Sequence, residues 1–118
     1  MEILPEVEVW YGLPAVRRRL AELLKEQGMT QRAIAEKLGM AESAVSQYLS
    51  GKRGGSKLPH KVDQQFSDAA AAITDGEQDD AKRQIMKLLE VLREERVICD
   101  IHRQHSPDVP RKCEVCFD

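Results

Sequence analysis

Four residues near the end of the chain have the types and the spacing of metal ligands. They form two pairs, with two residues inside each pair and ten between the pairs: Cys99 with His102, and Cys113 with Cys116. Thiolate and imidazole groups at this spacing make up the Cys3His set of closed tetrahedral metal sites. We therefore expect these four side chains to hold one metal ion, with His105 as an alternative to His102.

Three interpretations of this Cys/His tail, residues 99–118, follow from the ligand chemistry. A structural zinc ion fits the number and the spacing of the ligands. An iron–sulfur cluster, held by three thiolates and one imidazole, would make the tail a redox sensor. In the third interpretation the thiols bind no metal, and Cys113 and Cys116 form a redox pair. Because the tail has little apolar content, we expect it to fold only around a metal.

A second group of residues has side chains suited to reading the edges of DNA bases. If residues 42–50 form a helix, one side of it presents carboxylate, hydroxyl and amide groups: Glu42, Ser43, Ser46 and Gln47. In a major groove Gln pairs with adenine, Ser donates or accepts, and Glu accepts from cytosine. The opposite side is apolar, so it would face a core. The four polar residues are therefore candidates for base contacts.

Two short helices joined by a tight turn are needed to present this polar face. Thr30 stands where its hydroxyl caps a helix over residues 31–38. Gly39 ends that helix, because glycine adopts a left-handed conformation without steric cost. The second helix follows after two residues and ends at Gly51.

The positive charge of the chain is concentrated around these two helices. Residues 14–61 carry ten Lys or Arg and four Glu, a net of +6, whereas the whole chain has a net charge of −2. Local positive charge, more than the total, favours binding to phosphate. The candidate phosphate contacts lie at the start of the first helix and after the second helix: Thr30, Gln31, Lys52, Arg53 and Lys57.

Flanking segments are expected to supply the core that holds the two short helices. Pro14 fits the first position of a helix over residues 14–27, where its missing N–H costs nothing. Residues 62–74 have the apolar spacing of another helix. Residues 1–13 hold the only Trp, and their pattern suits a strand as well as a helix. We expect their aromatic side chains to pack against the core or a partner subunit.

A further amphipathic helix is predicted within residues 75–98. Its apolar residues recur at steps of three and four: Ala81, Ile85, Leu88, Leu89 and Leu92. Such a stripe, placed after the DNA-reading helices, suits the seam of a homodimer, and we expect a dimerisation helix. The alternative is that the stripe covers the core of the same chain.

Composition limits the class of protein. Hydrophobic residues make up 42 % and aromatic residues 4 % of the 118 residues, and good helix formers are abundant. The sequence has no run of about 18 apolar residues and no signal peptide, so we expect a cytoplasmic protein without membrane contact. No catalytic set of nucleophile, base and acid stands out, and a closed four-ligand metal site leaves no position for a substrate, so enzyme activity is not expected.

The segment from Thr30 to Arg53, TQRAIAEKLGMAESAVSQYLSGKR, resembles the helix-turn-helix of the phage-repressor-like (Xre/Cro) regulators. The resemblance rests on TQ opening the first helix, AEKLG leading into the turn and SAVSQYLSGKR covering the second helix. It implies an all-α, lambda-repressor-like bundle that binds double-stranded DNA as a homodimer on a palindromic operator. Together with the Cys/His tail, the arrangement is also similar to a group of small transcriptional regulators found mainly in archaea.

The expected organisation has four parts: an aromatic segment (1–13), a DNA-binding domain (14–74), a dimerisation helix (75–98) and a metal-binding tail (99–118). The expected function is sequence-specific transcriptional regulation, with zinc or an iron–sulfur cluster in the tail. The alternative is a protein-interaction module, such as an antitoxin or an adaptor, in which the helix-turn-helix and the tail bind protein. No small-molecule substrate is indicated.

Overall fold

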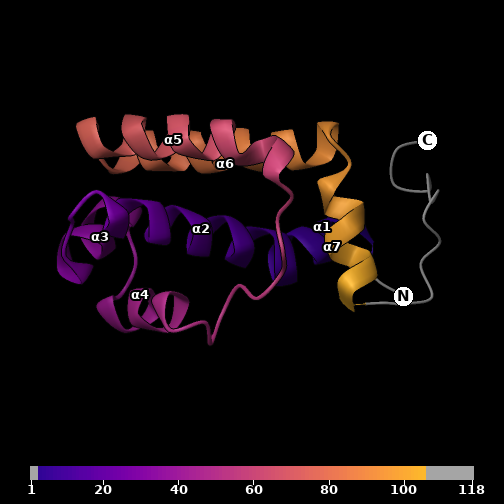
Figure 1. Cartoon of the computed structure of the whole chain (residues 1–118), viewed down its shortest axis with the longest axis horizontal. Coiled ribbons are helices and arrows are strands. Elements are labelled where there is room, and N and C mark those ends of the chain that lie inside the picture. The colour runs from indigo at the N-terminus through magenta and orange to yellow at the C-terminus, as the bar shows by residue number, and fades with distance from the viewer. Residues whose placement is uncertain (1–2, 106–118) are drawn as a thin grey trace.

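A computed structural model of the chain describes residues 3–105, except for the side chain of Gln78. Every regular element in this range is helical, which confirms the expected all-α fold (Figure 1). The elements are α1 (Leu4–Val7), the π-helical turn η1 (Glu8–Gly12), α2 (Leu13–Glu26), α3 (Gln31–Leu38), α4 (Glu42–Leu49), the 3-10 turn η2 (His60–Val62), α5 (Asp63–Asp75), α6 (Gln78–Glu94) and α7 (Val97–His105).

The N-terminal residues form a helix that continues directly into α2, so the helix start predicted at Pro14 is wrong. Gly12 and Leu13 have helical φ angles of −67° and −62°, and the Leu13 N–H reaches back five residues to the Glu8 carbonyl. A proline inside a helix lacks an N–H and crowds the carbonyl four residues earlier. The wider π turn directly before Pro14 accommodates this mismatch. Residues 4–12 are therefore helical, and the strand alternative is excluded.

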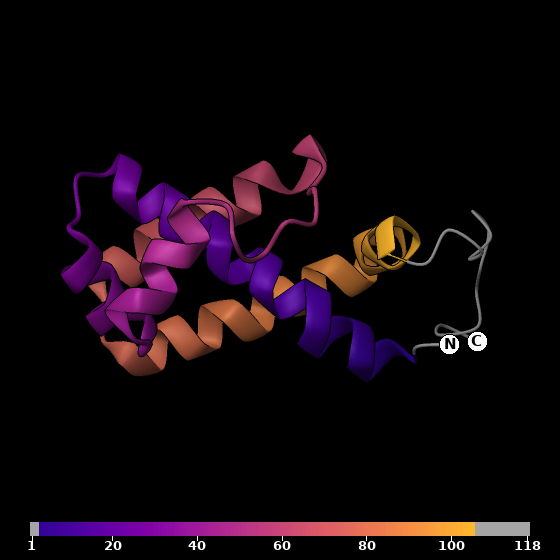
Figure 2. The same ribbon diagram turned by 90° about the horizontal axis from the view of Figure 1, so that it is seen from below.

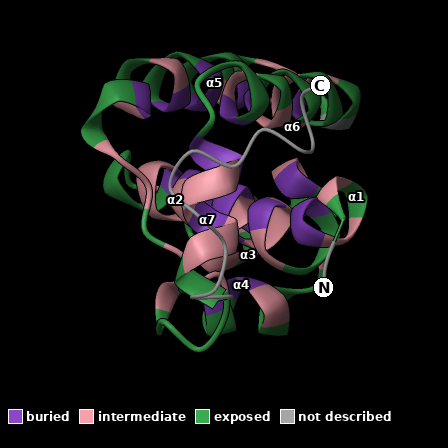
Figure 3. Cartoon of the chain, turned by 90° about the vertical axis from the view of Figure 1, so that its right-hand side faces the viewer, coloured by how far each residue is buried: buried purple, intermediate pink, exposed green. Residues whose placement is uncertain are grey.

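The core forms around α2, which contacts α3, α4, α5 and α6. Of the residues on α2, Val16, Leu20 and Leu24 are fully buried. Five apolar residues at the start of α5 and along one side of it are buried: Val62, Phe66, Ala69, Ala70 and Ile73. Their spacing of three and four residues places them on one helical face. Figure 3 shows the buried residues on the facing sides of the helices.

The apolar stripe of α6 packs on the core of the same chain. Ala81, Leu88 and Leu92 are buried, and Ile85 and Leu89 are partly buried against the core. The helix lies alongside α5 and also contacts α2 and α3 (Figure 1). The stripe thus covers the core of its own chain, which was the alternative to the expected dimer seam.

Residues 99–105 fold by burial, so the expectation that the whole Cys/His tail needs a metal to fold is wrong for this part. They belong to α7, whose side chains Val97, Ile98 and Ile101 are at most 1 % exposed. This helix packs against α6, α1 and η1, and Figure 2 shows it at the same end of the molecule as the N-terminal helix. The three apolar residues share one helical face, which continues through residue 99, where the sequence had placed the start of the tail.

An ion pair ties the N-terminal helix to α6. The Glu8 carboxylate accepts hydrogen bonds from Arg93, at 2.5 Å from Nη2 and 3.2 Å from Nε. The hydrogen bond to Glu8 raises the pKa of Arg93 above its usual value, so the guanidinium stays charged. Because half of the Arg93 side chain is exposed, water screens the pair and its contribution to stability is small. Its main role is to position the N-terminal helix against α6.

Candidate nucleic-acid interface

Local hydrogen bonds define both ends of α3, the first helix of the pair. The Thr30 hydroxyl accepts a hydrogen bond from the Ala33 N–H at 3.1 Å, as expected of an N-cap residue. Gly39 has a φ of 65°, and its N–H donates to the Ala35 carbonyl. These two local interactions set where α3 begins and ends, and so they fix the direction in which α4 starts. The predicted cap and turn are both confirmed.

The polar side of α4 faces solvent, because its apolar side is anchored in the core. Val45 and Tyr48 are buried, at 0 % and 3 % exposed. The four residues predicted to contact bases are all exposed: Glu42, Ser43, Ser46 and Gln47. Ala41 precedes the helix and has no side-chain acceptor, so no side chain caps the N–H groups of the first turn. That end of the helix is therefore open to an acceptor from a partner molecule.

The loop after α4 lies close against α2. Gly54 has a φ of 66°, and its carbonyl accepts a hydrogen bond from Arg18 Nη1 at 3.4 Å. A Cβ atom on Gly54 would lie 2.5 Å from the Pro14 carbonyl oxygen. Both the left-handed backbone and this close approach require glycine at the position.

The cations of this loop remain exposed. Lys52, Arg53 and Lys57 all face solvent, and the Lys52 N–H donates to the Gln47 carbonyl at 2.9 Å, directly after α4. The Arg53 guanidinium carbon lies 6.0 Å from the centre of the Tyr48 ring, within cation–π range. Of the other two phosphate candidates, Gln31 is partly buried, whereas Thr30 is exposed with its hydroxyl engaged as the α3 cap. The structure thus brings a polar helix face and three exposed cations onto consecutive segments.

Helix α7 holds the far end of this loop, a contact that the sequence did not indicate. The Gln104 side chain accepts from the Lys57 N–H at 2.9 Å and donates to the Lys57 carbonyl at 3.1 Å. One residue on, His105 Nε2 lies 2.8 Å from the Ser56 hydroxyl. The His105 ring is also stacked on Tyr11, with 3.8 Å between the ring centres. These contacts, which we call the α7 clamp, connect the end of the loop after α4 to α7.

The candidate metal ligands are divided by the boundary of the described residues. Cys99 and His102 lie on α7, both partly buried, while Cys113 and Cys116 lie outside the described residues. Between residues 3 and 105 no group of three or more His, Cys, Asp or Glu side chains could hold a metal ion. His105, the alternative ligand, has its Nε2 atom engaged with Ser56.

This geometry defines a helix-turn-helix whose second helix presents a polar face. In a comparison with protein families, residues 20–54 match the family HTH_3, described as helix-turn-helix; the match covers a little under a third of the chain. The segment is a helix-turn-helix of the Xre/Cro type, as its sequence predicted, and it supports a DNA-binding regulator. No curated protein and no solved structure gave a significant match to the chain. None of the helices that the structure describes is long and apolar enough to cross a membrane.

Proposed function

We propose that the protein is a sequence-specific transcriptional regulator that binds a palindromic operator as a homodimer. The observation that carries the proposal is the exposed polar face of α4 in a matched helix-turn-helix, followed directly by a loop with three exposed cations. A helix of this kind enters the major groove, where its polar side chains reach base edges while flanking cations bind the phosphate backbone.

The roles follow from position and chemistry. Glu42, Ser43, Ser46 and Gln47 read base edges, and Gln47 has the amide geometry for a bidentate pair with adenine. Lys52, Arg53 and Lys57 bind phosphates after the helix. Thr30 and Gln31 place the start of α3 against another phosphate, where backbone N–H groups at a helix start favour an anion.

Two substitutions separate base reading from phosphate binding. Gln47→Ala should weaken operator binding by about 1–3 kcal/mol while binding to random duplex DNA stays unchanged. Lys52→Ala should weaken binding to both duplexes alike and lower the salt slope by about one. Fluorescence anisotropy titrations with operator and random duplexes measure both effects. Equal losses on both duplexes for Gln47→Ala would refute the base contact, and no DNA binding at low salt would favour the protein-interaction alternative.

Dimerisation needs a surface other than the α6 stripe, since that stripe is buried in the chain. Large apolar side chains that stay exposed lie at the start of and along the N-terminal helix and on α6: Ile3, Val9, Trp10 and Met86. They offer apolar surface for a second copy. Analytical ultracentrifugation, without DNA and with a palindromic duplex, tests the dimer. One chain per duplex at saturation would refute it.

The proposal for the tail is a Cys3His metal site that holds zinc, with an iron–sulfur cluster as the alternative. Cys99 and His102 are three residues apart on α7, so their side chains lie on neighbouring turns of one face, which suits two ligands of one ion. Cys113 and Cys116 complete the set.

The metal content of protein purified without oxygen tests this part. Stoichiometric zinc without visible absorption supports the structural site. Iron with acid-labile sulfide supports the cluster, which would make the protein a redox-responsive regulator. Protein that contains neither metal would refute both assignments.

A further inference from the structure

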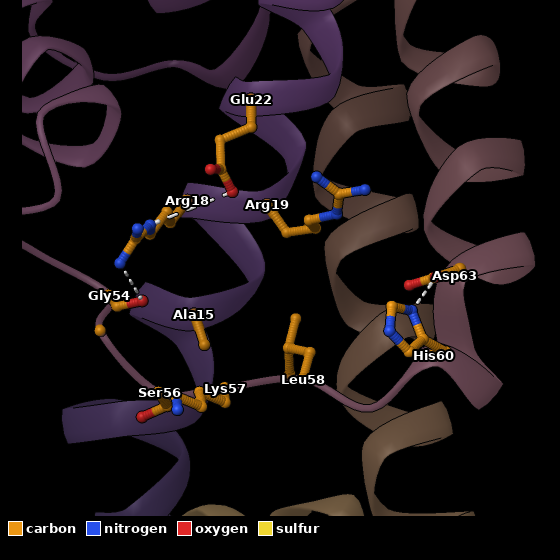
Figure 4. A pocket seen from close by; sticks show the side chains of 11 residues that line it. Ala15, Arg18, Arg19, Glu22, Gly54, Ser56, Lys57, Leu58, His60 and Asp63 are labelled. Atoms are coloured by element: carbon orange, nitrogen blue, oxygen red, sulfur yellow. Dashed lines mark hydrogen bonds and ion pairs between the residues drawn. The ribbon is translucent and has the colours of Figure 1, made fainter.

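A cavity of about 460 Å³ lies between α2, the loop at residues 54–58 and the start of α5. This size is within the usual range for sites that bind small molecules. Ala15 and Leu58 supply apolar lining. The charged lining comes from α2 on one side, from η2 and α5 on the other, and from Lys57 of the loop (Figure 4). The loop after α4 is therefore one wall of the cavity.

Among the described residues, the charged groups that line the cavity are paired except for Arg19 and the exposed Lys57 of the loop. Arg18 turns toward Gly54, donates to its carbonyl at 3.4 Å, and lies 4.0 Å from Glu22. On the opposite wall His60 Nδ1 lies 2.9 Å from the Asp63 carboxylate.

Arg19 points the other way from Arg18, toward the side of the gap where His60 and Asp63 lie (Figure 4). No hydrogen bond or ion pair joins its guanidinium to the described residues, although the side chain is partly buried. A guanidinium that faces a cavity and forms no ion pair with the described residues favours an anion, because a carboxylate or a phosphate satisfies its planar fork of donors.

We propose that this cavity binds a small organic anion, with a carboxylate or phosphate group on Arg19 and its carbon skeleton on Ala15 and Leu58. The bound anion would place negative charge beside the loop that carries Lys57, so it weakens DNA binding and acts as an effector. Binding of the anion does not depend on the function proposed above. Its effect on DNA affinity does rest on that proposed function.

Binding is tested without DNA by NMR titration of the full chain. The probes are inorganic phosphate, glycerol 3-phosphate and succinate, each added at constant ionic strength against sodium chloride. Saturable shifts of the Gly54 and Gly55 amide signals are expected with glycerol 3-phosphate or succinate. Arg19→Gln should weaken this binding about tenfold or more, as removal of a charge-assisted donor does. If no probe shifts these signals beyond sodium chloride, or if only inorganic phosphate does, the organic-anion site is refuted.

Two further variants make the test specific. Lys25→Gln removes one positive charge from the exposed end of the same helix, outside the cavity, and should leave binding unchanged. Gly55 lines the cavity, and a Cβ added there meets no atom within 4 Å, so Gly55→Leu should weaken binding by adding bulk at the cavity wall. Equal losses in Arg19→Gln and Lys25→Gln would show unspecific attraction and overturn the site.

A DNA titration distinguishes an effector site from a DNA contact. Without a probe, Arg19→Gln should bind a duplex with wild-type affinity and salt slope. With the probe, wild-type affinity should fall about fivefold or more, while the affinity of Arg19→Gln stays constant. A lower salt slope for Arg19→Gln alone would identify Arg19 as a DNA phosphate contact and overturn the effector assignment. Failure of all DNA binding would refute the proposed function but leave the NMR result on the cavity intact.

Discussion

Gln104→Ala should weaken DNA binding although Gln104 lies on the C-terminal helix and carries no charge. Its side chain makes two hydrogen bonds to the backbone of Lys57, at 2.9 and 3.1 Å. A neutral hydrogen bond contributes about 0.5–1.5 kcal/mol, and the low end applies at an exposed site such as this. The two bonds together therefore contribute about 1 kcal/mol to the order of the loop.

This loss should appear in the affinity for any duplex. Without the two Gln104 hydrogen bonds, part of the order of the loop must be gained at the moment of DNA binding, and this cost reduces the binding free energy. About 1 kcal/mol corresponds to about a fivefold rise in Kd. The salt slope should stay the same, because the variant keeps every cation of the loop. Anisotropy titrations with a random duplex at two salt concentrations measure both quantities, and no operator is needed.

A second glutamine serves as the matched control. Gln64 donates its amide to Asp68 within α5, at 2.8 Å, and makes no hydrogen bond to the loop among the described residues. Gln64→Ala should therefore leave duplex affinity unchanged. If Gln104→Ala binds as wild type while Lys57→Ala binds more weakly, Lys57 contributes to DNA binding without the Gln104 hydrogen bonds, and the proposed link between α7 and DNA affinity is refuted.

Two stability predictions follow from packing. Ile101→Ala should lower the free energy of unfolding by about 2–5 kcal/mol, because it leaves a cavity at a fully buried site on α7; a change under about 1 kcal/mol in urea denaturation would mean that α7 is not part of the core. Gly54→Ala should destabilise by about 2 kcal/mol or more, because its Cβ would lie 2.5 Å from the Pro14 carbonyl oxygen at a φ of 66°. Gly55→Ala is the control, and equal unfolding midpoints for the two variants would contradict the close approach.

Features that depend on a few neighbouring residues could be predicted from the sequence. The cap at Thr30 and the turn at Gly39 need only a hydroxyl acceptor and a left-handed residue at the right spacing, and both occur in the structure. The exposed face of α4 follows from helical periodicity, because anchoring Val45 and Tyr48 in the core turns the intervening polar residues outward.

The helix start at Pro14 could not be read correctly from local rules. Proline fits the first turn of a helix, so the sequence indicated a start there. The π turn at residues 8–12 lets the backbone pass through the proline, and packing of Val7 and Tyr11 against the core accompanies this longer helix. Local propensity gave way to tertiary packing at this point.

What the sequence determined by itself is the helix-turn-helix: its caps, its turn and its outward polar face are all encoded within two dozen neighbouring residues. The tertiary structure alone decided which surface each apolar stripe covers, because an amphipathic helix satisfies its apolar face equally well against its own chain or a partner. It placed the α6 stripe in the core and brought Gln104 to Lys57, 47 residues away in the chain. Such a contact depends on the packing of α7 through Val97, Ile98 and Ile101, and no local pattern around Lys57 encodes it.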